Sequence, residues 1–132
     1  MVFLCRDTDG NAERVKGALQ AQAANDWPFK VVLAIAAPEV EAWWIATANP
    51  TPGELASETQ RLGFDPRIEP HRLSSSPESP ADAKTVAKNL GADRAWRDVS
   101  FETIEKSAVD FLSLFVRGVH TSVVPLFDPR PQ

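Results

Sequence analysis

Two apolar segments separated by an amphipathic stretch constrain this chain most strongly. Residues 29–36 read FKVVLAIA, a β-branched and nearly continuous run that is typical of a strand buried on both faces. Val2–Cys5 is a shorter apolar run that turn residues follow at once, which favours a second buried strand. Ala12–Ala24 lies between them with apolar residues at helical spacing. Strand, helix and strand at these lengths predict a βαβ unit with parallel strands.

The rest of the chain reads as further helices in one domain. Its 132 residues are close to the usual size of a single domain, so we expect one α/β domain over 1–132. The expected fold is α/β, with a small, mostly parallel sheet flanked by helices. Four later helices are expected, two of them with capping signals at their starts. They span 40–48, 51–62, 79–90 and 100–116.

Two segments outside these helices have compositions typical of irregular structure. Residues 64–80 are rich in proline and serine, and we expect a flexible surface loop there. Residues 125–132 contain three prolines and are expected to form an extended tail. Cys5 is the single cysteine, which excludes an internal disulfide, and its apolar neighbours predict a buried thiol.

Charge and hydropathy narrow the class of protein. With a net charge of −4 and a pI near 5.1, the chain lacks the overall basic character of most nucleic-acid binders. These totals do not exclude a local basic patch. No apolar run approaches the ~20 residues of a membrane span, and the N-terminus lacks the pattern of a signal peptide. We therefore expect a cytoplasmic protein without membrane contact.

Acidic residues follow both expected strands. Asp7 and Asp9 come just after the first strand, and Glu39 and Glu41 follow the second. Ligands of parallel sheets collect beyond the carboxyl ends of the strands, so these carboxylates could converge. Clustered carboxylates are typical of a Mg²⁺ or Mn²⁺ site. Alternatively, the aspartates form a turn, and the glutamates stabilise the first turn of the next helix through its dipole.

Three further residues are candidates for binding. Lys84 lies on the expected 79–90 helix and could face a phosphate, although a solvated helix face is the commoner role of such a lysine. Trp43 and Trp44 follow the second acidic pair and could either pack under the sheet edge or bind a partner, because tryptophan is enriched at interface hot spots.

The order of these motifs resembles an uncharacterised bacterial family with a TOPRIM-like fold. The likeness rests on Asp7-Thr8-Asp9 after a strand, and on Pro38-Glu39-Val40-Glu41-Ala42-Trp43 after the next one. It is good over about residues 2–48 and looser beyond, where Lys84 and the 101–115 helix resemble later elements. The resemblance implies Asp7 and Asp9 as Mg²⁺ ligands for phosphodiester cleavage, with nucleic acid as substrate and a role in bacterial defence.

One part of the TOPRIM pattern is missing here. In TOPRIM domains a glutamate on an earlier strand acts as general acid or base, and this sequence starts at the Asp-x-Asp strand. Either Glu39 or Glu41 takes that catalytic role, or another chain supplies it, as in a homodimer, or the protein is inactive. The leading hypothesis is a Mg²⁺-dependent nuclease. The alternative is a non-catalytic, shortened relative that binds a partner protein through its Trp-rich edge.

Overall fold

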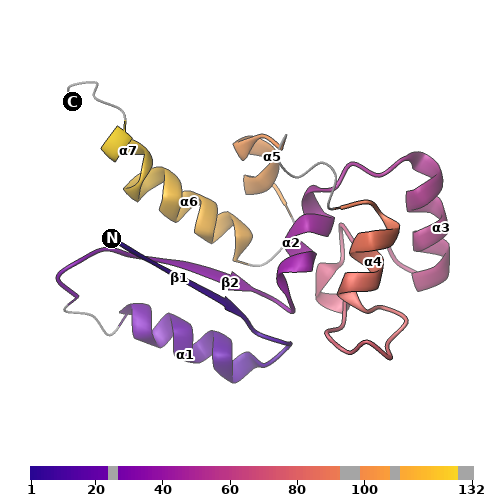
Figure 1. The fold of residues 1–132 in the computed structure, drawn as a ribbon, viewed down its shortest axis with the longest axis horizontal. Coiled ribbons are helices and arrows are strands. Elements are labelled where there is room, and N and C mark those ends of the chain that lie inside the picture. Colours follow the sequence, from indigo (N-terminus) through magenta and orange to yellow (C-terminus); the bar gives the residue numbers. More distant parts are fainter. Residues whose placement is uncertain (24–26, 93–98, 108–110, 128–132) are drawn as a thin grey trace.

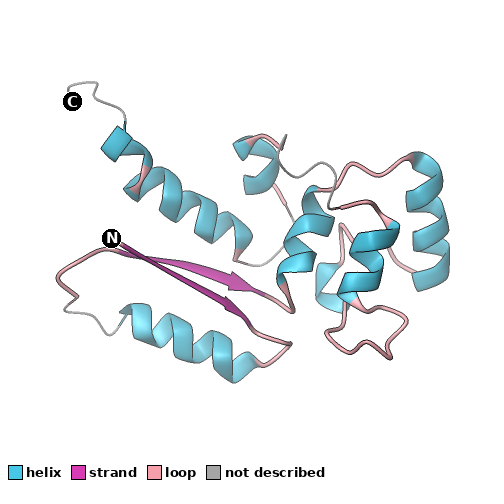
Figure 2. Cartoon of the chain, in the orientation of Figure 1, coloured by secondary structure: helices cyan, strands magenta, loops and turns pink. Residues whose placement is uncertain are grey.

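The computed structural model describes residues 1–23, 27–92, 99–107 and 111–127. Figure 1 traces the chain, and Figure 2 shows that helices make up most of it around a small sheet. In chain order the elements are β1 (Val2–Asp7), α1 (Ala12–Ala23), β2 (Val31–Ala36), α2 (Val40–Thr47), α3 (Pro52–Leu62), the 3-10 turn η1 (Pro70–Arg72), α4 (Ala83–Asn89), α5 (Phe101–Glu105), α6 (Leu112–Ser122) and α7 (Val124–Phe127). No helix among these described residues is long and apolar enough to cross a bilayer.

The predicted βαβ unit is confirmed. β1 and β2 form a two-stranded parallel sheet whose register runs from Val2 opposite Val31 to Asp7 opposite Ala36. Helices α1 and α6 lie on opposite sides of this sheet (Figure 1). Leu33 and Ile35 pack against α1, whereas a Cβ on Gly118 of α6 would meet Val32 at 3.1 Å. Alternate side chains of β2 therefore enter different layers, as a doubly covered strand requires. The fold is a small α/β fold.

The expectation that the first strand and Cys5 are buried is wrong. All six residues of β1 are exposed, and Cys5 is an exposed free thiol. The five residues Val32–Ala36, in contrast, are 2–5% exposed. The physical reason is position in the sheet: the two helices close over β2, and β1 is left at the edge with no strand beyond it among the described residues.

A second core holds α2, α3 and α4 together. Ile45 of α2 and Val86 of α4 are fully buried, and Leu90 is 1% exposed. Beside this core lies the buried Glu58 of α3. Its carboxylate accepts a hydrogen bond from Arg61 Nε at 3.0 Å and further bonds from the side-chain amide of Asn89 in α4. This second core anchors α2, the helix that follows the carboxyl end of β2.

The segment 64–80 is more structured than its composition suggested. It contains η1, buried Phe64 and Leu73, and a parallel bridge between Ser74 and Asp82. The buried apolar side chains and the bridge tie this segment to the second core, in place of the flexible loop that we expected.

Two expectations near the C-terminus differ from the structure. The single helix predicted over 100–116 is two helices, α5 and α6, and Phe111 before α6 has a left-handed φ of 67° that an α-helix cannot contain. Residues 125–127, which we expected to begin an extended tail, belong to the helix α7. The remaining tail residues, 128–132, lie outside the described residues.

The capping signal that predicted α3 is confirmed and supports a stability prediction. Thr51 Oγ1 accepts the Glu54 N–H at 3.3 Å, and Glu54 Oε2 accepts the Thr51 N–H at 2.8 Å. Thr51→Ala should lower the free energy of unfolding by about 1 kcal/mol, because a helix N–H loses its acceptor. Urea denaturation measures this change. Thr51→Ser keeps the oxygen and should retain most of the stability; equal losses in both variants would contradict the capping account.

Candidate functional site

The loop after β1 is tied to the loop after β2. The Thr8 side chain is 1% exposed, and its hydroxyl donates to the Pro38 carbonyl at 3.3 Å. The Thr8 N–H donates to Ala36 O at 3.0 Å, and the Asp9 N–H to Pro38 O at 2.9 Å. These bonds extend the parallel pairing beyond the strands. They hold the Asp7–Asp9 loop and the start of α2 at the same edge of the sheet, as the rule for parallel strands predicted.

The two aspartates of this loop have different surroundings. Asp7, the last residue of β1, is exposed. The Asp9 side chain, which is 51% exposed, forms an ion pair with Arg14 on the first turns of α1. Asp9 also has a left-handed φ of 49°, which directs this residue into the turn before α1. The structure therefore brings Asp7 to the start of α2 and pairs Asp9 with a cation instead.

Glu39 is the most unusual carboxylate of the site. It occupies the N-cap position of α2 without capping the helix, and it is only 6% exposed. Its Oε1 atom lies 3.5 Å from Lys84 Nζ, and its Oε2 atom is buried with no hydrogen-bond partner among the described residues. Burial raises the pKa of Glu39; the charge of Lys84 opposes this rise, whereas Glu41 and Asp7 add to it.

Glu41 completes the group. This residue lies in the first turn of α2 and is half-buried. Glu39 and Glu41 both raise the pKa of Lys84, which is the electrostatic sign of a cation close to two carboxylates. We call Asp7, Glu39, Glu41 and Lys84 the edge cluster. Electrostatic interactions thus link four of the residues proposed from sequence, contributed by the end of β1, the N-cap and first turn of α2, and α4.

A metal cage is not part of this arrangement. Within residues 1–23, 27–92, 99–107 and 111–127, no group of three or more histidine, cysteine, aspartate or glutamate side chains could by itself hold a metal ion. The three carboxylates of the edge cluster do not form such a group, and Lys84 is a cation rather than a metal ligand.

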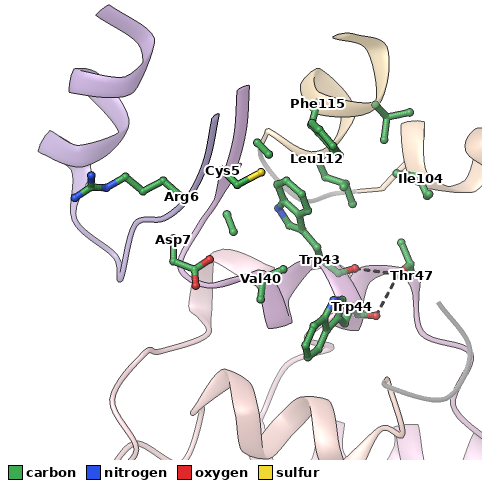
Figure 3. A pocket seen from close by; sticks show the side chains of 13 residues that line it. Cys5, Arg6, Asp7, Val40, Trp43, Trp44, Thr47, Ile104, Leu112 and Phe115 are labelled. Atoms are coloured by element: carbon green, nitrogen blue, oxygen red, sulfur yellow. Dashed lines mark hydrogen bonds between the residues drawn. The ribbon is translucent and has the colours of Figure 1, made fainter. Parts of the chain in front are cut away.

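The two tryptophans lie beside the edge cluster and are half-buried. Trp43 stacks on Phe115 of α6 with ring centroids 5.6 Å apart, and Trp44 packs against the second core. Both line an apolar cavity of about 360 Å³ between the sheet and helices α2, α5 and α6. Figure 3 shows Cys5 and Asp7 of β1 at this cavity, across from Trp43. The two tryptophans thus pack under the sheet edge, which is one of the two roles that the sequence left open.

Sequence reasoning missed two features of the site. Thr8 lies between the aspartates, and its buried hydroxyl joins the loop after β1 to the loop after β2. No sequence pattern distinguishes a threonine in this role from any other threonine in a turn. The Asp9–Arg14 pair joins residues five apart, across the turn into a helix, which is not a spacing that helical periodicity reveals.

Comparisons with family models, with curated protein sequences and with solved structures found no match to this chain. The assignment of a function therefore rests on the site itself and on the motifs of the sequence.

The raised pKa of Glu39 predicts a dependence of stability on pH. A carboxyl whose pKa is raised in the folded state favours folding below its unfolded value near 4.5 and loses this contribution as the pH rises through its folded pKa. Glu39→Gln removes the titrating group, so it should gain stability relative to the wild type between pH 4 and pH 7. Urea denaturation at both pH values measures this difference.

The matched control is Glu102→Gln, which removes an exposed carboxylate that pairs with Lys106 on α5. Because surface pairs contribute little, this substitution should change stability much less with pH. A Glu39→Gln variant whose stability relative to the wild type is the same at both pH values would show that burial of Glu39 does not disfavour its charged form.

Proposed function

We propose that the edge cluster binds Mg²⁺ and that the protein is a metal-dependent phosphodiester hydrolase of the nuclease type. The observation that carries this proposal is the convergence of Asp7, Glu39, Glu41 and Lys84 at the carboxyl edge of a parallel sheet. That edge is where ligands of open α/β sheets bind. The motif order, which resembles the TOPRIM-like family, supports the same chemistry.

The donors of the edge cluster fit Mg²⁺ better than a metal that needs a closed cage. Mg²⁺ usually keeps several waters and is held by one or two carboxylates together with substrate phosphates. Asp7 is exposed at the strand end and Glu41 is half-buried in the first turn of α2, so these two are the proposed ligands. The cation would neutralise charge on the phosphodiester and lower the pKa of a bound water.

Glu39 and Lys84 have separate roles in this proposal. Glu39 is a buried carboxyl with a raised pKa, and such a group retains its proton at a higher pH than an ordinary glutamate. It would therefore donate a proton to the leaving oxygen, a contribution of roughly 10²–10⁴-fold to the rate. The Lys84 side chain is 65% exposed and would orient a phosphate oxygen as a mobile point charge.

An activity assay over several phosphodiesters tests this proposal. The purified chain is incubated with single-stranded DNA, duplex DNA, RNA and bis(p-nitrophenyl) phosphate, each with Mg²⁺, Mn²⁺ or EDTA. Cleavage of at least one substrate that needs the metal and falls sharply in Glu39→Gln supports the proposal. Cleavage that persists in EDTA, or no cleavage of any substrate with either metal, would reject it.

A further inference from the structure

The outer edge of β1 carries unpaired backbone groups. The Val2 N–H donates to Lys30 O and the Thr8 N–H donates to Ala36 O, so the even-numbered residues direct their backbone groups toward β2. In a parallel pair, backbone groups alternate between the two edges of a strand. Phe3, Cys5 and Asp7 therefore direct their N–H and carbonyl groups outward, where no backbone partner exists among the described residues.

The side chains along this edge are apolar and accessible. Val2, Phe3 and Leu4 are 41–48% exposed, and the neighbouring Cys5 is exposed as well. Native edge strands are usually protected from pairing by a lysine, a proline, a bulge or a covering helix. Val2–Cys5 contains no proline and no charge, and α1 and α6 close over β2 instead. The edge therefore has the features of a pairing surface.

From this edge we infer that two copies of the chain pair through β1, antiparallel, about a two-fold axis at Leu4. The pairing would turn two sheets of two strands into one sheet of four, in the order β2-β1-β1-β2. Sheets of four to six strands are typical, so the paired sheet would have the commoner size. Two-fold symmetry requires the strand to pair with itself in the antiparallel sense.

The residues of β1 select this register. With the axis at Leu4, the outward backbone groups of Phe3 face those of Cys5 in the second copy, and Leu4 meets Leu4. Apolar side chains then lie opposite apolar ones. An axis at Cys5 would place Phe3 opposite Asp7 and bury a carboxylate against an aromatic ring, and an axis at Phe3 would shorten the overlap.

The same register separates like charges. Arg6 of one copy lies opposite Val2 of the other, which is four residues from the second Arg6, or roughly 13 Å along a strand. The two Asp7 residues lie at opposite ends of the paired strands, roughly 20 Å apart. Both separations exceed the screening length of about 8 Å at physiological salt, so repulsion between these pairs is weak. The charges of β1 therefore do not oppose a second copy, and the match of apolar side chains favours it.

Disulfide trapping tests the register. At a non-hydrogen-bonded antiparallel pair the Cα atoms are about 4.5 Å apart, which a disulfide can span. Leu4→Cys in a Cys5→Ser background should give a covalent dimer under mild oxidation. Val2→Cys in the same background is the matched control, because Val2 and Leu4 are similarly exposed, at 43% and 41%. In this register the two Val2 residues of the dimer lie far apart, so this variant should not cross-link. Equal cross-linking of both variants would overturn the inference.

A measurement of mass tests the dimer without oxidation. Light scattering coupled to size exclusion should give about twice the 14.5 kDa chain mass for the wild type. Cys5→Pro removes an outward N–H but leaves the bonds to β2, because proline is tolerated when its missing N–H faces away from the ladder. This variant should elute as a monomer with an unchanged circular dichroism spectrum. A wild-type monomer at every concentration would overturn the inference.

Discussion

Replacing Asp7 by asparagine should lower the Mg²⁺-dependent cleavage rate by at least about 100-fold, since the metal supplies several kcal/mol of charge stabilisation. The substitution keeps the size and shape of the side chain, removes its charge and replaces one acceptor oxygen by an amide donor. Asp7 is exposed at the end of β1, so the fold should be unaffected. Initial rates under saturating Mg²⁺ measure the effect, and circular dichroism checks the fold.

Asp9→Asn is the matched control for this prediction. It removes an equivalent carboxylate two residues away, but Asp9 is paired with Arg14, whereas Asp7 raises the pKa of Glu39. We expect a loss of less than about 10-fold, attributable to the weakened turn, since exposed ion pairs contribute about 0–1 kcal/mol. Equal losses in the two variants would contradict the different roles assigned to the aspartates.

Ile45→Ala should lower the free energy of unfolding by about 2–5 kcal/mol, because it leaves a cavity among fully buried neighbours. Ile45 is 0% exposed in the second core, where α2 meets α4. Since these helices carry Glu39, Glu41 and Lys84, the variant should also lose activity at temperatures where the wild type is stable. Urea denaturation at 25 °C gives the change in free energy.

Ile68→Ala is the control for this second prediction. Ile68 has the same side chain but is 66% exposed in the segment between α3 and η1. Its removal should change stability by no more than about 0.5 kcal/mol, as is usual for surface positions. A small effect at Ile45 would contradict the account of the second core.

The elements that hydrophobic periodicity and caps define could be predicted from the sequence. Residues 29–36 are apolar almost throughout, and the observed β2 is Val31–Ala36. Thr51 and Glu54 fit the capping pattern and form both of its hydrogen bonds. In these places local preference and tertiary packing agree, so a local pattern is enough.

The exposure of β1 could not be predicted in the same way. Val2–Cys5 is as apolar as a central strand, and the sequence alone does not tell how many strands flank it. The division of the predicted 100–116 helix was missed for a related reason: the apolar spacing runs through it, whereas α5 ends at Glu105 and Phe111 before α6 has a left-handed backbone.

For the site, the position of the carboxylates was predictable and their surroundings were not. The rule for parallel strands places Asp7 and Glu39 at one edge, and the structure does so. The burial of Glu39 and its contact with Lys84 depend on how α4 packs against α2, which joins residues 45 positions apart. Such long-range packing leaves no local signature.

Isothermal titration calorimetry of Mg²⁺ into the wild type and into Asp7→Asn tests the central claim most directly, because it measures binding without a substrate. The account predicts a saturable binding isotherm for the wild type that Asp7→Asn abolishes and Asp9→Asn largely retains. No binding to the wild type, or the same isotherm in Asp7→Asn, would contradict a magnesium site at the edge cluster.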